Sequence, residues 1–112
     1  MEVDFSQQKL AKLCNSERDM ARRFGPEGAT RIARRLAQLE AAPSLEDLRD
    51  MPGRCHELVG NRKGTLSVDL HGPYRLLFMP SANPPPRKPD GGLDWSRVDA
   101  VTIIDIIDTH DN

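Results

Sequence analysis

The stretch Arg54–Phe78, RCHELVGNRKGTLSVDLHGPYRLLF, decides the fold that this chain can adopt. It contains three short runs with the character of β-strands, separated by two turn signals, GNRKG and HGP. Within TLSVDL, apolar and polar residues alternate, which is typical of a strand with one buried face. The same stretch also contains two histidines, three arginines and a lysine, so it concentrates polar chemistry on the expected sheet.

The HGP turn fixes how two of these strands pair. A three-residue turn at 71–73 places six apolar side chains on one face of the sheet, in the cross-strand pairs Leu70–Tyr74, Val68–Leu76 and Leu66–Phe78. A two-residue turn would move one apolar set to the polar face, so the three-residue turn is favoured. The favoured register also sets Asp69 opposite Arg75, a pair of opposite charges that stabilises a sheet.

Helices are expected before this sheet region. Residues 1–5 alternate as a strand, Ser6 is placed to cap a short helix over 7–15, and Ser16 is placed to cap a further turn before Gly25-Pro26 breaks the chain. The pattern from Glu27 to Ala42 predicts a longer helix with one apolar stripe, formed by Ala29, Ile32, Ala33, Leu36 and Leu39. We expect the opposite, solvent-facing side to carry Arg31, Arg34, Arg35 and Gln38. Ser44 and Asp47 then form an approximate capping box for one more turn.

The end of the chain predicts a long loop and a last strand. Residues 80–97 hold five of the nine prolines and cannot form a central strand, and Trp95 is expected to anchor the end of this loop. Residues 98–108 are apolar on both faces, which is typical of a strand at the centre of a sheet. The sequence therefore predicts one α+β domain over residues 1–112. An N-terminal strand and two to three helices would pack on one face of a mainly antiparallel sheet of four to five strands.

Composition narrows the classes of function. The net charge is −1, but residues 1–88 carry 15 Lys and Arg against 11 Asp and Glu, whereas residues 89–112 carry one against six. This distribution permits a nucleic-acid partner without requiring one. The N-terminus lacks the pattern of a signal peptide, no apolar run approaches a membrane span, and the two cysteines have no CxxC spacing. We therefore expect a cytoplasmic protein with no membrane association, disulfide, cofactor or metal.

With RCHELVGNRKGTLSVDLHGPYRLLF, the GGLDW loop and the closing IIDTH in view, the chain resembles the RelE/HigB-like toxins, also described as plasmid-maintenance killer proteins. The resemblance implies a RelE-like fold and a ribosome-dependent endoribonuclease that cuts mRNA in the A site. It also implies a small helix-turn-helix antitoxin, HigA-like, as partner, with operator DNA contacted only through that antitoxin. Two positions depart from the family pattern: Val59 replaces a common lysine, and Thr109 replaces the tyrosine of some members.

The residues of this chain suit that chemistry. Cleavage of RNA without a metal needs a base for the 2′-hydroxyl, cations around the phosphorane and an acid for the leaving oxygen. Histidine suits the proton transfers, and arginine suits the phosphate. The expected catalytic residues, placed by the resemblance, are His56, Arg62, Arg75 and His110. Contacts to the RNA are expected from Lys63, Arg54 and Asp108.

Other interpretations stay open at the level of sequence. Arg75 could serve only as the structural partner of Asp69, His56 could be a core histidine, and His71 is expected to be structural in its turn. A metal site formed by the three histidines lacks ligand-motif spacing. For the whole chain, the alternatives are a toxin of the same fold that poisons gyrase by binding, and a catalytically weakened member that acts mainly with its antitoxin in operon repression.

Overall fold

The hairpin at the HGP turn has the register expected from the sequence. The computed structural model of the chain describes residues 1–111, and in it β3 (Leu66–Asp69) pairs antiparallel with β4 (Tyr74–Pro80). The predicted cross-strand pairs are all confirmed, in the order Leu66–Phe78, Val68–Leu76 and Asp69–Arg75, with a hydrogen bond from the Leu70 amide to the Tyr74 carbonyl closing the turn. Register therefore follows from the requirement that one face be apolar.

Within residues 1–111, five strands form one sheet in the order β1-β5-β4-β3-β2. The remaining three strands are β1 (Glu2–Phe5), β2 (His56–Glu57) and β5 (Ala100–Asp108). The sheet is mainly antiparallel, as expected, and only the β1–β5 pair is parallel. The prediction that the last strand lies at the centre is correct only in part. β5 lies between β1 and β4, while β4 is the middle strand, and Ile104 and Ile107 of β5 are only half-buried.

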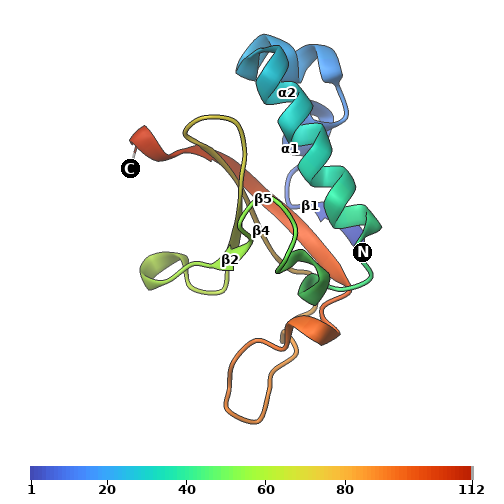
Figure 1. Cartoon of the computed structure of the whole chain (residues 1–112), viewed down its shortest axis with the longest axis vertical. Coiled ribbons are helices and arrows are strands. Elements are labelled where there is room, and N and C mark those ends of the chain that lie inside the picture. Colours follow the sequence, from blue (N-terminus) through green and yellow to red (C-terminus); the bar gives the residue numbers. More distant parts are fainter. Residues whose placement is uncertain (112) are drawn as a thin grey trace.

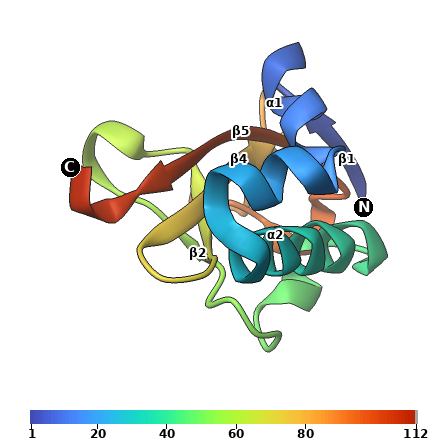
Figure 2. The same cartoon turned by 90° about the horizontal axis from the view of Figure 1, so that it is seen from above.

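Two α-helices, α1 (Gln8–Cys14) and α2 (Glu17–Ala41), lie on one side of the sheet within the described part of the chain (Figures 1 and 2). Ser16 caps α2 as expected, because its Oγ accepts a hydrogen bond of 3.1 Å from the Asp19 amide. Ser6 does not cap α1. Gln7 occupies that position and makes no capping bond through its side chain. Gly25, with φ of 79°, breaks the helical geometry inside α2, which explains the predicted interruption.

The other short elements are 3-10 turns. They are η1 (Leu45–Leu48), η2 (Gly60–Arg62), η3 (Trp95–Arg97) and η4 (Thr109–Asp111). The capping box of Ser44 and Asp47 at the start of η1 is confirmed. None of the helices in residues 1–111 is both long and apolar enough to cross a membrane.

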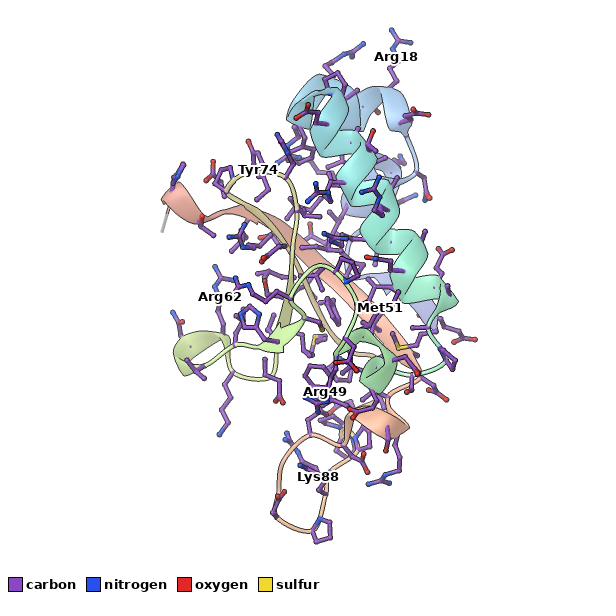
Figure 3. The ribbon with its side chains drawn as sticks, viewed as in Figure 1. Arg18, Arg49, Met51, Arg62, Tyr74 and Lys88 are labelled. Carbon is purple, nitrogen blue, oxygen red and sulfur yellow. The ribbon has the colours of Figure 1, made fainter. Side chains whose placement is uncertain are left out.

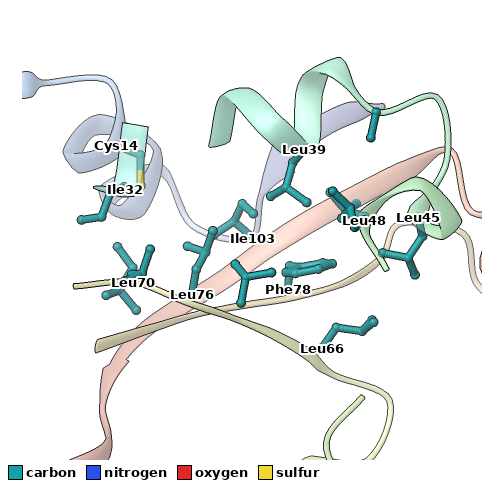
Figure 4. Close-up of a cluster of buried hydrophobic side chains, with 14 of the residues drawn as sticks. Cys14, Ile32, Leu39, Leu45, Leu48, Leu66, Leu70, Leu76, Phe78 and Ile103 are labelled. Atoms are coloured by element: carbon teal, nitrogen blue, oxygen red, sulfur yellow. The ribbon is translucent and has the colours of Figure 1, made fainter. Parts of the chain in front are cut away.

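The hydrophobic core lies between the helices and the sheet (Figure 4). Ile32 and Leu39 of α2 face Leu76 and Phe78 of β4 and Ile103 of β5, and each of these side chains is almost completely buried. Burial of a side chain of this size stabilises the fold by about 1.5–3 kcal/mol. These contacts fix α2 against the middle of the sheet.

Arg35 is the main exception to the predicted helix pattern. The prediction that it faces solvent is wrong, because only 6% of the residue is exposed. Its Nε donates a hydrogen bond of 2.8 Å to the carbonyl of Asp69, and its Nη1 donates one of 3.0 Å to Gln38 Oε1. Burial, followed by repulsion from Arg31 and Arg34, lowers the pKa of the Arg35 guanidinium. Ala33, which the prediction placed in the apolar stripe, is exposed instead.

A glycine makes room for this buried guanidinium. Gly53 has φ of +114°, and a Cβ atom at this position would lie 2.8 Å from Arg35 Nε. Any other residue would therefore both strain the backbone and collide with the guanidinium. The Gly53 carbonyl in turn accepts a hydrogen bond of 2.7 Å from the Asp69 amide, which joins this segment to the end of β3.

The proline-rich loop is anchored at its far end, as expected from the sequence. Trp95 is buried, and its Nε1 donates a hydrogen bond of 3.0 Å to Glu57 Oε2 on β2. The guanidinium of Arg49 lies 3.9 Å from the centre of the Trp95 ring, a cation–π contact. Nearer its tip, the loop forms an isolated bridge between Arg87 and Leu93.

The buried arginine leads to a test of stability. Replacing Arg35 by alanine should lower the free energy of unfolding by about 1–3 kcal/mol, because the Asp69 carbonyl loses its buried donor. Replacing the exposed neighbour Arg34 by alanine is the matched control and should change it by less than about 0.5 kcal/mol. Urea denaturation measures both. Equal losses for the two variants would contradict the structural role of Arg35.

Candidate active site

The face of the sheet turned away from α1 and α2 carries three of the predicted site residues, Arg54, His56 and Arg75, and we refer to it as the open face. Because strand residues alternate between faces, the neighbours of core residues such as Leu66 and Phe78 lie on this other side. One row across the open face consists of His56, Ser67 and Leu77, and the next consists of Asp69, Arg75 and Ile107. Leu77 is buried, yet it is not part of the core cluster beneath the helices.

Asp69 holds two arginines on the open face. Its carboxylate accepts hydrogen bonds from Arg54 through Nε at 3.1 Å and Nη2 at 3.2 Å, and it pairs with Arg75 Nε at 3.0 Å. These contacts confirm the predicted Asp69–Arg75 pair and add Arg54, which the sequence analysis did not connect to Asp69. The hydrogen bond to Asp69 is the main cause that raises the pKa of the Arg54 guanidinium.

The Arg75 guanidinium is fixed by further contacts. Its Nη1 donates to the carbonyls of Gly72 at 3.1 Å and Tyr74 at 2.8 Å. Within the described chain, these contacts engage Nε and Nη1 and leave Nη2 without a hydrogen bond. One end of the planar fork is therefore held rigidly, and the other is available to an anionic group.

His56 is half-buried on the open face and is not enclosed in the core. Its Nδ1 lies 2.8 Å from the carbonyl oxygen of Arg54. Because a carbonyl oxygen only accepts hydrogen bonds, Nδ1 must carry the proton in this contact. In the neutral ring, the lone pair is then on Nε2. The backbone of Arg54 thus selects the tautomer in which Nε2 of His56 can act as a base.

Arg62 and Lys63 belong to the turn that follows β2. Arg62, the last residue of η2, is half-buried and lies on the side of the sheet away from α2 (Figure 3). Lys63 is exposed and lines a cavity of about 710 Å³ between this turn and the proline-rich loop, whose far wall includes Arg87 and Leu93. Arg62 therefore borders the open face beside β2, whereas Lys63 faces a cavity lined by Glu57 and Leu66, which lie on the other face of the sheet.

His110 and Asp108 lie at the end of β5, close to the end of the sheet that carries Arg75. The Thr109 amide donates a hydrogen bond of 3.0 Å to the Pro73 carbonyl, which attaches this last turn to the start of β4. Asp108 Oδ1 accepts a hydrogen bond of 2.9 Å from the His110 amide and lies 3.7 Å from His110 Nδ1. The His110 side chain is 80% exposed. In residues 1–111, no hydrogen bond or ion pair joins it to the other predicted catalytic residues.

The structure therefore assembles the predicted site in part. Arg54, His56 and Arg75 share the open face, and the Cα atoms of His56 and Arg75, two strands and one row apart, are separated by about 12 Å according to standard strand spacing. Arg62 borders this face beside β2, and His110 borders it at the end of β5. The Asp69 carboxylate is the functional group that sequence reasoning did not include in the site.

His71 lies outside this assembly. Its Nε2 is 3.2 Å from Glu27 Oε2 on α2, in agreement with a structural role in the turn. Among the described residues, no group of three or more His, Cys, Asp or Glu side chains is arranged to hold a metal ion.

Both cysteines are free, and their thiols are hard to ionise. Burial raises the pKa of Cys14 to about 11 and the pKa of Cys55 to about 12. Neither thiol has the low pKa that marks a reactive cysteine, so nucleophilic chemistry is not expected from them.

Comparison of the chain with protein-family models gives no match, and comparison with curated proteins also gives none. The candidate site therefore stands on its own geometry.

The thiols predict a dependence of stability on alkaline pH. Above about pH 9, the cysteines of the unfolded chain ionise while those of the folded chain stay protonated, so the unfolded state binds fewer protons and the folded state loses stability. Denaturant titrations between pH 8 and pH 11 should show a steeper decline for the natural chain than for a variant carrying both Cys14→Ala and Cys55→Ala. Parallel declines for the two proteins would contradict the raised pKa values.

Proposed function

We propose that this protein is a RelE/HigB-like toxin with a RelE-like fold, and that it cleaves mRNA in the ribosomal A site. One observation supports this proposal most: the Nδ1 atom of His56 is bound to a carbonyl, which frees Nε2 as a base on the same face as the anchored guanidinium of Arg75. A base and fixed cations on one surface are what metal-free cleavage of RNA requires.

The reaction follows from these groups. Nε2 of His56 takes the proton of a ribose 2′-hydroxyl, and the 2′-oxygen then forms a bond to the adjacent phosphorus. Arg75, with Arg62 near the same face, stabilises the negative charge that develops on the phosphorane. The bond to the 5′-oxygen breaks, and that oxygen takes a proton from His110. The products are a 2′,3′-cyclic phosphate and a 5′-hydroxyl. The tautomer of His56 favours it as the base, which leaves the role of acid to His110.

The charge balance of the open face sets how RNA would bind. Asp69 offsets one of the two positive charges of Arg54 and Arg75 and orients both guanidinium groups. An arriving phosphate is held by the part of the Arg75 fork that Asp69 does not engage. Lys63 and Arg62 at the neighbouring turn add contacts to the RNA backbone, which carry no sequence information.

The proposed partners follow from the same resemblance. The chain would bind mRNA on the ribosome in the cytoplasm, and a helix-turn-helix antitoxin of the HigA type would neutralise it. Operator DNA would be contacted only through that antitoxin.

A second candidate function is a catalytically weakened toxin that acts mainly in repression with its antitoxin. Two observations favour it. Val59 is 84% exposed at the position where the family commonly has a lysine, so packing does not account for the apolar side chain there. In addition, the Asp69 carboxylate already engages both Arg54 and Arg75 and reduces the positive charge available to RNA.

Expression in a bacterial host without an antitoxin tests the proposal. The natural chain should arrest growth, and primer extension should map cuts inside codons of translated mRNA. Replacing His56 by alanine should reduce cleavage by about 100-fold or more, because the base is lost. Replacing His71 by alanine is the matched control and should leave cleavage unchanged, since this histidine is exposed and contacts α2. Full cleavage by the His56 variant would refute the assigned role.

The same experiment separates the rival functions. Induction of the DNA-damage response without mRNA cuts would indicate a gyrase poison. Absence of any phenotype, combined with retained binding of the antitoxin encoded beside it, would indicate the weakened member. Circular dichroism of each purified variant confirms that the fold is intact.

A further inference from the structure

The strand β5 continues beyond the strand that covers its outer edge. β1 pairs with β5 only from Ala100 to Ile103, and the last hydrogen bond of this pairing runs from the Ser6 amide to the Ile103 carbonyl at 2.9 Å. The chain then leaves the sheet to form α1, whereas β5 runs on to Asp108 (Figure 1). Residues 105–108 are therefore paired with β4 on one side only, and Ile104, at a bulge in the β4–β5 register, pairs with neither neighbouring strand. We call residues 104–108 the β5 edge.

The backbone of the β5 edge has hydrogen-bonding capacity that the sheet does not use. The Ile106 amide donates at 2.8 Å to Oδ1 of Asp105, the side chain of its own neighbour, and the carbonyl of an incoming strand would replace this acceptor. The backbone N–H and C=O groups of successive residues on a strand point alternately to its two sides. The groups of every second residue in this segment therefore face away from β4. An unpaired edge of this kind is a template for another strand.

A groove runs beside the β5 edge. It has a volume of about 480 Å³ and lies between α1, the first turns of α2 and β5. Its apolar lining comes from Leu10 and Leu13 of α1 and from Ile104 of β5. Its charged lining comprises the cations Lys9, Lys12, Arg22 and Arg23 and the carboxylates Asp19 and Asp105. The groove is therefore an apolar slot with a net positive rim.

We propose that the β5 edge and its groove bind an extended, acidic segment of a partner protein, which adds to the sheet as a further strand. Main-chain hydrogen bonds to residues 104–108 would hold the segment in register, as in other cases of strand addition. Apolar side chains of the segment would fill the slot at Leu10 and Leu13, and its carboxylates would face Lys12 and Arg22. This inference goes beyond RNA cleavage and does not depend on it.

The alternative occupants fit less well. Among the described residues that line the groove there is no aromatic side chain, and single-stranded RNA uses such side chains as a stacking platform. A second copy of this chain, paired edge to edge, would bring two positive rims together, and like charges facing each other oppose association. An extended segment with acidic side chains can form main-chain hydrogen bonds with the β5 edge, and its negative charge is opposite to that of the groove rim.

Nuclear magnetic resonance of the ¹⁵N-labelled full chain tests the proposal, with a synthetic octapeptide of alternating glutamate and valine as the probe. The peptide should shift the amide signals of residues 104–108 and of Lys12, and it should slow hydrogen exchange at the edge. A peptide of alternating lysine and valine should bind at least about tenfold more weakly, because the charge complementarity is reversed. The glutamate peptide with N-methyl groups on alternate amides should lose binding, because it cannot complete the ladder.

Matched charge reversals complete the test. The double variant Lys12→Glu and Arg22→Glu should weaken binding of the glutamate peptide by about tenfold or more. The double variant Arg87→Glu and Lys88→Glu, on the distant proline-rich loop, changes the net charge equally and should bind as the natural chain does (Figure 3). Both pairs are exposed, so folding is preserved in each variant.

Three results would overturn the proposal. The first is equal binding by the two double variants or by the N-methylated peptide. The second is a concentration-dependent dimer in analytical ultracentrifugation that the Lys12 and Arg22 reversals leave intact and that blocks the peptide, since a second copy would then occupy the edge. The third is displacement of the peptide from residues 104–108 by a uridine octanucleotide, which would identify the groove as an RNA surface.

Discussion

The hydrogen bond from Arg35 to the Asp69 carbonyl is the contact on which the rest of the structure depends. It joins α2 to the end of β3 through a guanidinium that is almost completely buried. A charge in this position is costly unless its donors are satisfied, and here Gln38 and Asp69 accept from it. Burial of this guanidinium also requires glycine at position 53, because any side chain there would occupy the same space. The contacts of Arg35 thus fix α2, the end of β3 and the loop that contains Gly53 to one another.

The same residue connects the scaffold to the open face. While the backbone of Asp69 bonds with Arg35 and Gly53, its carboxylate holds Arg54 and Arg75 on the opposite side of the sheet. Arg54, held in a left-handed conformation with φ of 51°, then presents its own carbonyl to the imidazole of His56. The position of the candidate base is therefore set through a chain of contacts that begins inside the core. A site built in this way is preorganised by packing and not by a flexible loop.

Much of the fold could be predicted because it depends on local patterns. The β3–β4 register followed from the alternation of TLSVDL and the length of one turn, and the caps at Ser16 and Ser44 followed from side-chain chemistry close in sequence. Arg35 escaped prediction because helical periodicity assigns a long polar side chain to solvent. It cannot show that a strand 34 residues away needs a donor. The contact between Arg54 and Asp69 was missed for the same reason, since it joins a turn to a strand edge. The placement of β5 depended on its pairing with β1, which no local pattern reveals.

The parallel pairing of β1 with β5 joins the first strand of the described chain to the last. A ribosome releases residues 2–5 long before residues 100–103, so during synthesis the first strand has no partner while both helices and the HGP hairpin are already available to form. Pairing between segments so far apart in sequence is slow, because the entropy of a long loop is lost before the hydrogen bonds between the strands can form. The apolar undersides of α1 and α2 consequently stay partly uncovered until β5 emerges. Completion of the sheet, and with it the ordered open face, therefore waits for the synthesis of the segment that forms β5.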